Sequence, residues 1–156
     1  MAEPPRLTER PLWTCPSCGY RFVTANIWHS CTSIGLDEAF NGSAPAVRAA
    51  FDAFVDLIAR CGPVTVIAQK SRIVVMGRVR FAGATVRRDR LIANFALPRR
   101  LDDPRYRIEA YNQHWIAHRF DVRSAADLDI PGLPELLCES YRELGMQGAL
   151  ARRRAR

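Results

Sequence analysis

Residues 64–97 read VTVIAQKSRIVVMGRVRFAGATVRRDRLIANFAL. Short runs rich in valine and isoleucine, separated by polar turn residues, are typical of β-strands. The stretch therefore predicts four strands, over residues 64–70, 72–77, 79–85 and 90–97. The connections between them are short, and short connections join antiparallel neighbours.

Two further strands are predicted beyond a loop over residues 98–104. In each of them apolar and charged side chains alternate, which is the pattern of a strand with one buried face. The apolar positions are Tyr106, Ile108 and Ala110 in the first strand, and Ile116, His118, Phe120 and Val122 in the second. Residues 112–114 are expected to form the turn between the two strands.

Helices are predicted on either side of the strands. Over residues 45–60 the apolar positions share one helical face, proline occupies the first turn, and Gly62 with Pro63 ends the segment. A short turn capped by Ser124 is expected over residues 125–128, and a last helix over about residues 135–144. This order predicts an α+β fold, with the helices packed on one face of a meandering antiparallel sheet of five or six strands.

The chain of 156 residues divides into four parts. Residues 1–12 are predicted to be a flexible leader, 13–34 a zinc-binding segment, 35–147 the α+β domain and 148–156 a basic tail. The formal net charge is +7, but four arginines lie in the last five residues, so the body carries only about +3. This charge fits a solvated surface with a basic tail, or weak binding to nucleic acid or another polyanion.

Hydropathy predicts a cytoplasmic protein without membrane contact. No apolar run approaches the ~20 residues of a transmembrane helix, and residues 1–13 lack the apolar core of a signal peptide.

Three of the five cysteines cluster near a histidine, which in a cytosolic chain indicates metal binding before disulfides. Cys61 and Cys138 stand alone and are interpreted as small buried hydrophobic residues.

The cysteine cluster has the spacing of a metal site. WTCPSCGYRF, residues 13–22, and WHSC, residues 28–31, together give C-x2-C-x10-H-x-C. Cys15 and Cys18 can hold one cation in a tight turn completed by Gly19, while His29 and Cys31 leave the same face of an extended chain. Three thiolates and one imidazole fit tetrahedral Zn²⁺ and leave no open coordination position. The sequence therefore predicts a structural zinc site.

Two alternatives to zinc are a redox-active pair in Cys15-Pro-Ser-Cys18 and a set of unliganded thiols. A redox pair normally opens a long helix, whose N-terminus lowers the pKa of a thiol, and Gly-Tyr-Arg-Phe does not open a helix well. The aromatic residues of the segment also have two interpretations. Trp13, Tyr20, Phe22 and Trp28 form either the small hydrophobic cluster of a zinc ribbon or a stacking surface for bases.

The chain resembles a bacterial family catalogued as domain of unknown function 5655, in the version with an N-terminal zinc segment. The matching residues are Trp13, Cys15, Pro16, Cys18, Gly19, Phe22, His29, Ser30, Cys31, Leu36, Asp37, Phe40, Gly62, Pro63, Val64, Lys70, Ile73, His118, Arg119, Phe120, Ser124, Leu128 and Asp129. The resemblance covers about residues 13–144. It implies zinc binding and an α+β fold, and it implies no reaction because the family has no established activity.

A second candidate site lies among the basic residues of the predicted sheet. Lys70, the only lysine, ends a strand beside Arg72, and His118 and Arg119 are neighbours on another strand. Several cations presented together repel one another unless an anion joins them. We interpret these four residues as an anion-binding site; the simpler alternative is a solvated lysine, a buried structural histidine and ion pairs to nearby carboxylates.

The acidic residues form no catalytic constellation. Glu109 and Asp121 are as readily explained as cross-strand partners of arginines, and the sequence contains no phosphate-binding glycine loop or nucleophile elbow. The leading hypothesis is a non-enzymatic binding module for an anionic partner, with nucleic acid as the first candidate. The alternatives are an enzyme acting on a small anionic substrate through Lys70, His118 and Arg119, and a protein–protein interaction or assembly module.

Overall fold

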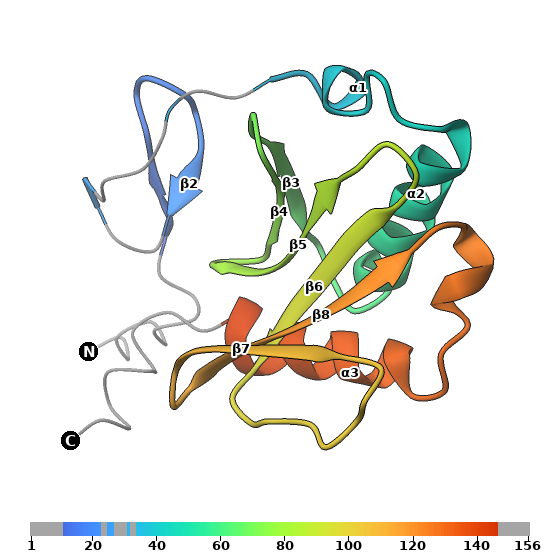
Figure 1. Ribbon diagram of the computed structural model, residues 1–156. Coiled ribbons are helices and arrows are strands. Elements are labelled where there is room, and N and C mark those ends of the chain that lie inside the picture. The colour runs from blue at the N-terminus through green and yellow to red at the C-terminus, as the bar shows by residue number, and fades with distance from the viewer. Residues whose placement is uncertain (1–10, 23–24, 27–30, 32–33, 147–156) are drawn as a thin grey trace.

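The computed structural model describes residues 11–22, 25–26, 31 and 34–146. The elements in chain order are β1 (Trp13–Thr14), β2 (Arg21–Phe22), α1 (Leu36–Ala39), α2 (Pro45–Ala59), β3 (Thr65–Ala68), β4 (Ile73–Met76), β5 (Arg80–Val86), β6 (Leu91–Leu97), β7 (Arg107–Asn112), β8 (Trp115–Val122), the 3-10 turn η2 (Ala125–Leu128), α3 (Leu133–Ser140) and the π-helical turn η3 (Tyr141–Gly145). β1 and β2 form a small sheet, and β3 to β8 form one larger sheet with α2 and α3 on the same face (Figure 1). The predicted α+β fold is confirmed.

α2 forms where the sequence places an apolar stripe on one helical face. Pro45 occupies the first turn, where its missing N–H costs no hydrogen bond. The buried stripe consists of Val47, Ala50, Phe51, Phe54 and Ile58. Phe54 packs edge-on against Phe120 of β8 with ring centroids 6.1 Å apart, and this contact docks the helix on the sheet. The helix predicted over residues 45–60 is confirmed to within one residue.

The larger sheet is antiparallel, in the order β3-β4-β5-β6-β8-β7. The predicted meander holds as far as β6 and then breaks, because β8 rather than β7 pairs with β6. The connection over residues 98–106 is long enough to carry the chain past one strand position. After the tight turn at Gln113 and His114, β8 occupies the position between β6 and β7. β7 is therefore an edge strand, and its side chains are mostly exposed.

Alternation along β6 and β8 separates two chemically different faces of the sheet. The inner face, against α2 and α3, carries Leu91, Ala93, Phe95, Leu97, His118, Phe120 and Val122. The outer face carries the residues in between, which are Ile92, Asn94, Ala96, Trp115, Ala117, Arg119 and Asp121. The inner face is therefore the hydrophobic core, while the outer face mixes small, polar and charged side chains.

α3 and η3 attach the C-terminal part of the described chain to the sheet. The hydroxyl of Ser140, which is fully buried, donates to the carbonyl oxygen of Ala96 in β6. α3 begins two residues earlier than predicted, and the helix changes to a π turn after Ser140. After this turn the carbonyl oxygen of Gly145 accepts hydrogen bonds from the backbone N–H groups of Arg78 and Val79, at 2.7 and 3.0 Å.

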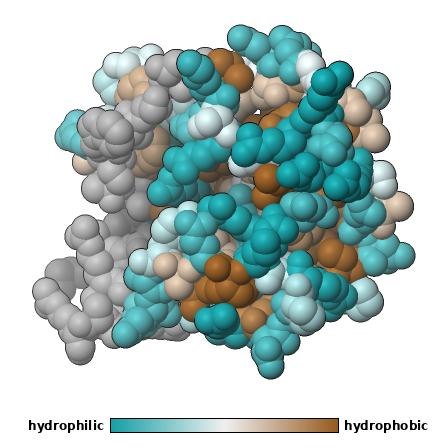
Figure 2. Space-filling view, viewed as in Figure 1, coloured by the Kyte–Doolittle hydropathy of each residue, from teal (hydrophilic) through white to brown (hydrophobic). Residues whose placement is uncertain are grey.

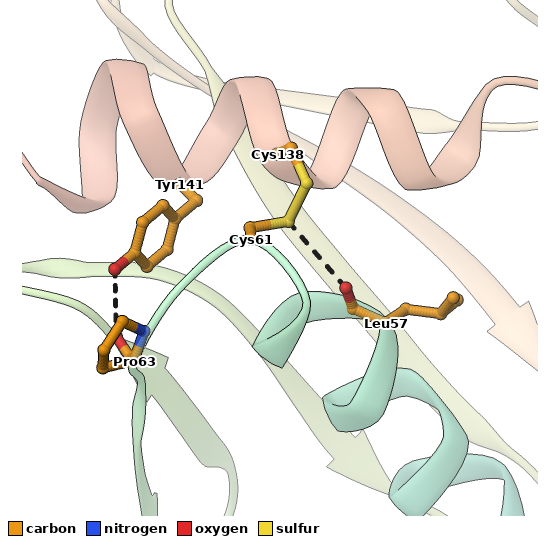
Figure 3. The surroundings of a disulfide bond; sticks show 5 residues. All are labelled: Leu57, Cys61, Pro63, Cys138 and Tyr141. Atoms are coloured by element: carbon orange, nitrogen blue, oxygen red, sulfur yellow. Dashed lines mark hydrogen bonds between the residues drawn. A yellow bond between two sulfur atoms is a disulfide. The ribbon is translucent and has the colours of Figure 1, made fainter.

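A disulfide bond joins Cys61, directly after α2, to Cys138 in α3, and the two Cα atoms lie 5.1 Å apart (Figure 3). The interpretation of these residues as unpaired small hydrophobic residues is therefore wrong. They are separated by 77 positions in sequence, and only the packing of α3 against α2 brings them together. Beside the bond, the Tyr141 hydroxyl donates to the carbonyl oxygen of Pro63 at 3.1 Å, and Cys61 Sγ lies 3.8 Å from the carbonyl oxygen of Leu57.

The disulfide is relevant to the cytoplasmic location predicted from the sequence. Structural disulfides persist mainly in oxidising environments and are rare in the cytosol, so the Cys61–Cys138 bond does not favour the cytoplasmic prediction. Among the described residues, no helix combines the length and the apolar character needed to cross a bilayer.

Candidate metal centre and anion site

The β1–β2 hairpin presents Cys15 and Cys18 on the turn between its strands. The backbone N–H of Gly19 donates to the carbonyl oxygen of Cys15 at 2.8 Å, and the N–H of Cys15 donates to the carbonyl oxygen of Tyr20 at 2.7 Å. Gly19 has a φ of +76°, a left-handed conformation that glycine adopts without steric cost. Cys31 approaches this turn from later in the chain, and the three sulfur atoms lie within 4.8 Å of one another.

This cluster of three cysteines has the dimensions of a tetrahedral metal site. Zn–S bonds of ~2.3 Å place two tetrahedral sulfur ligands about 3.8 Å apart, and the sulfur atoms of Cys15 and Cys31 lie 3.9 Å apart. Sulfur ligands are soft donors that select Zn²⁺ over Mg²⁺ or Ca²⁺. His29, the predicted fourth ligand, lies outside the described residues. The described cluster thus offers three thiolates to a metal ion.

The three thiols strongly influence one another's protonation. The pKa of Cys15 is lowered to about 6, mainly because the backbone N–H of Cys18 points at its sulfur. The pKa of Cys31 is raised to about 11, first by desolvation and then by hydrogen bonds with Cys15 and Cys18 and by their charge. One sulfur therefore loses its proton readily while another retains it, since neighbouring thiolates repel. A divalent cation among the three sulfur atoms would offset that repulsion.

The surroundings of the hairpin fit a metal site better than a redox pair. Cys18 leads into β2 and not into a helix, so this hairpin offers Cys15 no helix N-terminus of the kind that activates thiols in redox motifs. Trp13 and Phe22 are cross-strand partners whose ring centroids lie 6.2 Å apart. Their contact supplies a small hydrophobic cluster, the first of the two roles predicted for these aromatic residues. Trp28 lies outside the described residues.

A hollow of about 480 Å³ lies on the outer face of the larger sheet, and we call it the sheet hollow. Its lining includes Gly83, Asn94, Ala96 and Ala117, which we call its floor, and Arg72, Arg80, Tyr111, Trp115 and Arg119, which we call its rim. The floor is low because three of its four residues have a small side chain or none. Gly83 also permits close packing, since a β carbon there would lie 2.5 Å from the carbonyl oxygen of Ile73 in β4.

The three rim arginines differ in their partners. Arg72 donates from Nε to the side-chain oxygen of Gln69, a neutral group, at 3.2 Å. Arg119 forms an ion pair with Glu109 of β7. Arg80 is exposed and forms no ion pair with a described residue. No carboxylate is found among the described residues that line the hollow, so the charge of the lining itself is positive.

The end of the β7–β8 hairpin forms an aromatic wall along one side of the sheet hollow. The pairing register of the two strands shifts between Ala110 and Asn112, which leaves Tyr111 as an extra residue in β7. Such bulges redirect side chains, and Tyr111 lines the hollow together with Trp115 while remaining 61% exposed. Nη2 of Arg119 donates to the Tyr111 hydroxyl at 3.3 Å, which holds the ring beside the hollow.

Two of the four residues predicted to bind an anion lie elsewhere. His118 is buried on the inner face, where its ring stacks on Phe95 with centroids 5.3 Å apart. Its Nε2 accepts the backbone N–H of Leu101 at 3.1 Å and its Nδ1 faces the carbonyl oxygen of Ile116 at 3.0 Å, the pattern of a neutral ring protonated at Nδ1. Lys70 is exposed in the β3–β4 turn and is not part of the hollow lining. The structure therefore brings together only Arg72 and Arg119 of the predicted set.

The carboxylates of the outer face pair with arginines, as the simpler alternative expected. Glu109 pairs with Arg119, and Asp121 pairs with Arg107 at 2.7 Å. Arg107 and Arg119 are themselves cross-strand partners, and two like charges in that position repel. Each carboxylate offsets part of this repulsion, which leaves no acidic pair free for catalysis on these two strands.

Sequence reasoning missed four residues of the sheet hollow: Arg80, Asn94, Tyr111 and Trp115. For Asn94 a signal was present, because it is the one polar residue in the otherwise apolar run of residues 91–97. Its side-chain amide forms no hydrogen bond with a described residue. Tyr111 could not be placed by alternation alone, since its position depends on the bulge in β7.

These features define a class of small α+β protein, in which a six-stranded antiparallel sheet is covered on one face by two helices and preceded by a cysteine-containing hairpin. Residues 36–143 match the family model described as domain of unknown function (DUF5655), and the chain belongs to this family. The match includes all six strands of the larger sheet and begins after the cysteine hairpin. No curated protein and no solved structure matches the chain significantly.

Proposed function

We propose that this protein is a zinc-stabilised binding module whose sheet hollow contacts the phosphate groups of a nucleic acid. The observation that carries the proposal is the gathering of Arg72, Arg80 and Arg119 around one hollow, with no carboxylate among its described lining residues. Guanidinium groups remain charged at physiological pH and bind phosphates through paired N–H groups. The net charge of +7 adds a general attraction for polyanions.

The lining of the sheet hollow favours binding over catalysis. Its described residues include no carboxylate, imidazole or thiol, the groups that most often act as general acids, general bases and nucleophiles. An enzyme that used Lys70, His118 and Arg119 together would need all three on one face of the sheet. His118 is instead fully buried on the inner face.

Within this proposal, Cys15, Cys18, His29 and Cys31 hold a structural Zn²⁺. Four protein ligands leave no open coordination position, so the ion would activate no water molecule. A hairpin with strands of two residues each is too short to build a hydrophobic core of its own, and metal binding would supply the missing folding free energy.

The surface gives less support to an assembly function. On the face shown in Figure 2, hydrophobic residues form separate small patches between hydrophilic ones. Among the described residues, Tyr111 is the exposed large hydrophobic residue, and it is hydrogen-bonded to Arg119. An aromatic ring beside an arginine fits a polar ligand with a planar group better than a continuous apolar interface.

The test is a comparison of two triple variants by fluorescence anisotropy with a labelled single-stranded oligonucleotide at ~50 mM salt. The first replaces the hollow arginines with alanine: Arg72→Ala, Arg80→Ala and Arg119→Ala. The matched control removes the same charge from exposed positions outside the hollow: Arg60→Ala, Arg87→Ala and Arg142→Ala. We expect the hollow variant to lose at least about tenfold in affinity, and its salt dependence to flatten by about 2 in slope, whereas the control should lose much less.

Equal losses in the two variants would show that binding follows net charge and not the hollow. Absence of binding by the unmodified protein at ~50 mM salt would refute the proposal outright. A variant lacking residues 152–156 separates the tail from the folded domain. The proposal expects this variant to retain its dependence on Arg72, Arg80 and Arg119.

A further inference from the structure

We infer that the sheet hollow binds one unpaired nucleotide, with its base stacked on the Tyr111–Trp115 wall and its phosphate held by Arg80. This inference rests on the proposed function and adds the class of nucleic acid, a single strand. In a duplex the bases are already paired and stacked, so only an unpaired base can present its face to an aromatic side chain.

The aromatic wall has the features of a stacking platform. Tyr111 is 61% exposed, although most large apolar side chains of the described chain are buried. The β7 bulge places it on the outer face, and its hydrogen bond from Arg119 limits rotation of the ring. Trp115 lines the same hollow from the start of β8. Stacking on such rings accepts any base, because every base has a π face.

Asn94 is placed to contact the edge of a stacked base. It lies in the floor of the sheet hollow, and its cross-strand partners are Gly83 on one side and Arg119 on the other. Its side-chain amide forms no hydrogen bond with a described residue. An amide offers both a donor and an acceptor, which is the combination that the Watson–Crick edge of a base requires.

The arginines lie on the opposite side of the hollow from the aromatic wall. Arg72 precedes β4 and Arg80 begins β5, while Tyr111 and Trp115 belong to β7 and β8. β5 and β8 are separated by β6, which corresponds to about 10 Å at the usual strand spacing. A base on the wall therefore leaves its phosphate near Arg80, whereas Arg72 lies towards the other end of the strands and would contact a neighbouring phosphate. The volume of the hollow, about 480 Å³, lies within the ~300–1,000 Å³ range of small-molecule sites.

The small side chains of the floor leave room in the sheet hollow for a base beside the aromatic wall. Ala96 and Ala117 are cross-strand partners below the aromatic wall, and Gly83 has no side chain at all. Larger residues at these positions would fill the space in which a base must lie. The floor thus supports a flat ligand without competing for its hydrogen bonds.

The test compares two single-stranded oligonucleotides of ~10 nucleotides that carry the same number of phosphates. One is an oligothymidylate, and the other has abasic sugars in place of every nucleotide. The unmodified full-length protein should bind the oligothymidylate at least about tenfold more tightly than the abasic strand. Tyr111→Ala should remove most of that difference and affect binding of the abasic strand much less, whereas Tyr111→Phe, which keeps the ring and loses only the hydroxyl that accepts from Arg119, should retain most of the difference.

Equal binding of the two strands by the unmodified protein would overturn the stacking inference while leaving the phosphate-binding function intact. Failure to bind either strand would overturn both. Tyr111 is exposed, so its variants should fold; equal circular dichroism spectra verify this. If Tyr111→Ala weakened binding to the abasic strand as much as to the oligothymidylate, the ring would act on the arginines and not on a base, and the inference would be wrong.

Two further probes identify the source of the nucleotide. Thymidine monophosphate at millimolar concentration should displace the oligothymidylate if the hollow accepts a free nucleotide, and should fail to do so if neighbouring phosphates of a strand are needed. A duplex of the same length should show no dependence on Tyr111, and a Tyr111-dependent duplex interaction would contradict the inference.

Discussion

His118 and Arg119 are consecutive in sequence, yet they lie on opposite faces of β8. His118 packs between Phe95 and Tyr106 in the core, while Arg119 lines the sheet hollow. The two-residue period of a strand forces this separation. As a result His118 holds the preceding loop to the sheet through the N–H of Leu101, and only Arg119 is available to a ligand.

The stability of the fold should depend on the protonation of His118. Burial, aided by the charges of Arg99 and Arg100, lowers its pKa from the ordinary 6.5. The unfolded chain therefore binds a proton at His118 more readily than the folded protein does. The contribution of neutral His118 to the stability of the fold is complete above pH 6.5, and it is lost as pH falls from there towards the lower pKa of His118 in the folded protein. We expect the melting temperature to decrease between about pH 6.5 and pH 5.

The matched variants for this test are His118→Gln and His114→Gln. A glutamine side chain takes up no proton in this pH range and can still accept the N–H of Leu101, so His118→Gln should flatten the pH dependence. His114 is exposed in the β7–β8 turn, and its replacement should leave the dependence unchanged. The nearby Glu139 has a pKa lowered by Arg99 and so titrates below the window. A melting temperature that fell equally in both variants would contradict this role of His118.

Zinc content tests the cysteine cluster. Protein purified without chelator should contain about one zinc ion per chain, because Cys15, Cys18 and Cys31 converge and the proposed fourth ligand, His29, would complete a tetrahedral set. Cys18→Ser and His29→Ala should each lower the zinc content and loosen the N-terminal hairpin, with little change in the sheet signal. Ser17→Ala, which alters the same turn without removing a ligand, is the control. Elemental analysis far below one equivalent in the unmodified protein would count against the site.

The Cys61–Cys138 bond predicts a difference between oxidised and reduced protein. After zinc removal and denaturation without reductant, three of the five thiols should react with a thiol reagent. Cys61→Ala with Cys138→Ala should lower the free energy of unfolding by about 2–4 kcal/mol, because the bond closes a long loop in the unfolded chain. Reductant should destabilise the unmodified protein and leave the double variant unaffected. Five reactive thiols before reduction would rule out the bond.

Glu109 should limit the affinity of the sheet hollow for phosphate. Its ion pair with Arg119 offsets one of the three rim charges. Glu109→Gln should therefore raise affinity for a single-stranded oligonucleotide several-fold at low salt, with the gain disappearing as salt screens the charges. Glu135→Gln removes the same charge from an exposed position on α3 and should have a smaller effect. A gain of equal size in the two variants would assign the effect to net charge.

Most of the core could be predicted from the sequence, because the spacing of apolar residues along a helix or strand indicates which of its faces is buried. The apolar stripe of α2 and the alternation in β7 and β8 place Phe54, Ile108 and Phe120 correctly. The same spacing does not indicate which strand pairs with which. The order β6-β8-β7 depends on the length of the loop over residues 98–106, and no local pattern distinguishes that order from a continued meander.

The candidate sites show the same division between local and long-range information. The turn at Cys15 and Cys18 follows from residues adjacent in sequence, and it was predicted. The Cys61–Cys138 bond and the sheet hollow depend on contacts between distant elements. Lys70 and His118 were grouped with Arg72 and Arg119 because charge and sequence proximity were the available signals, and the sheet separates them by face and position.

Ultraviolet cross-linking of the full-length protein to an oligothymidylate, followed by mass spectrometry of tryptic peptides, tests the central claim most directly. The peptide of residues 108–119, which contains both Tyr111 and Trp115, should carry the main nucleotide adduct. In the triple variant at Arg72, Arg80 and Arg119 the corresponding tryptic peptide extends to residue 123, and its adduct should be strongly reduced. Adducts confined to Trp13, Trp28 or residues 152–156 would place binding on the cysteine segment or the tail, and would contradict the sheet hollow as the nucleic-acid site.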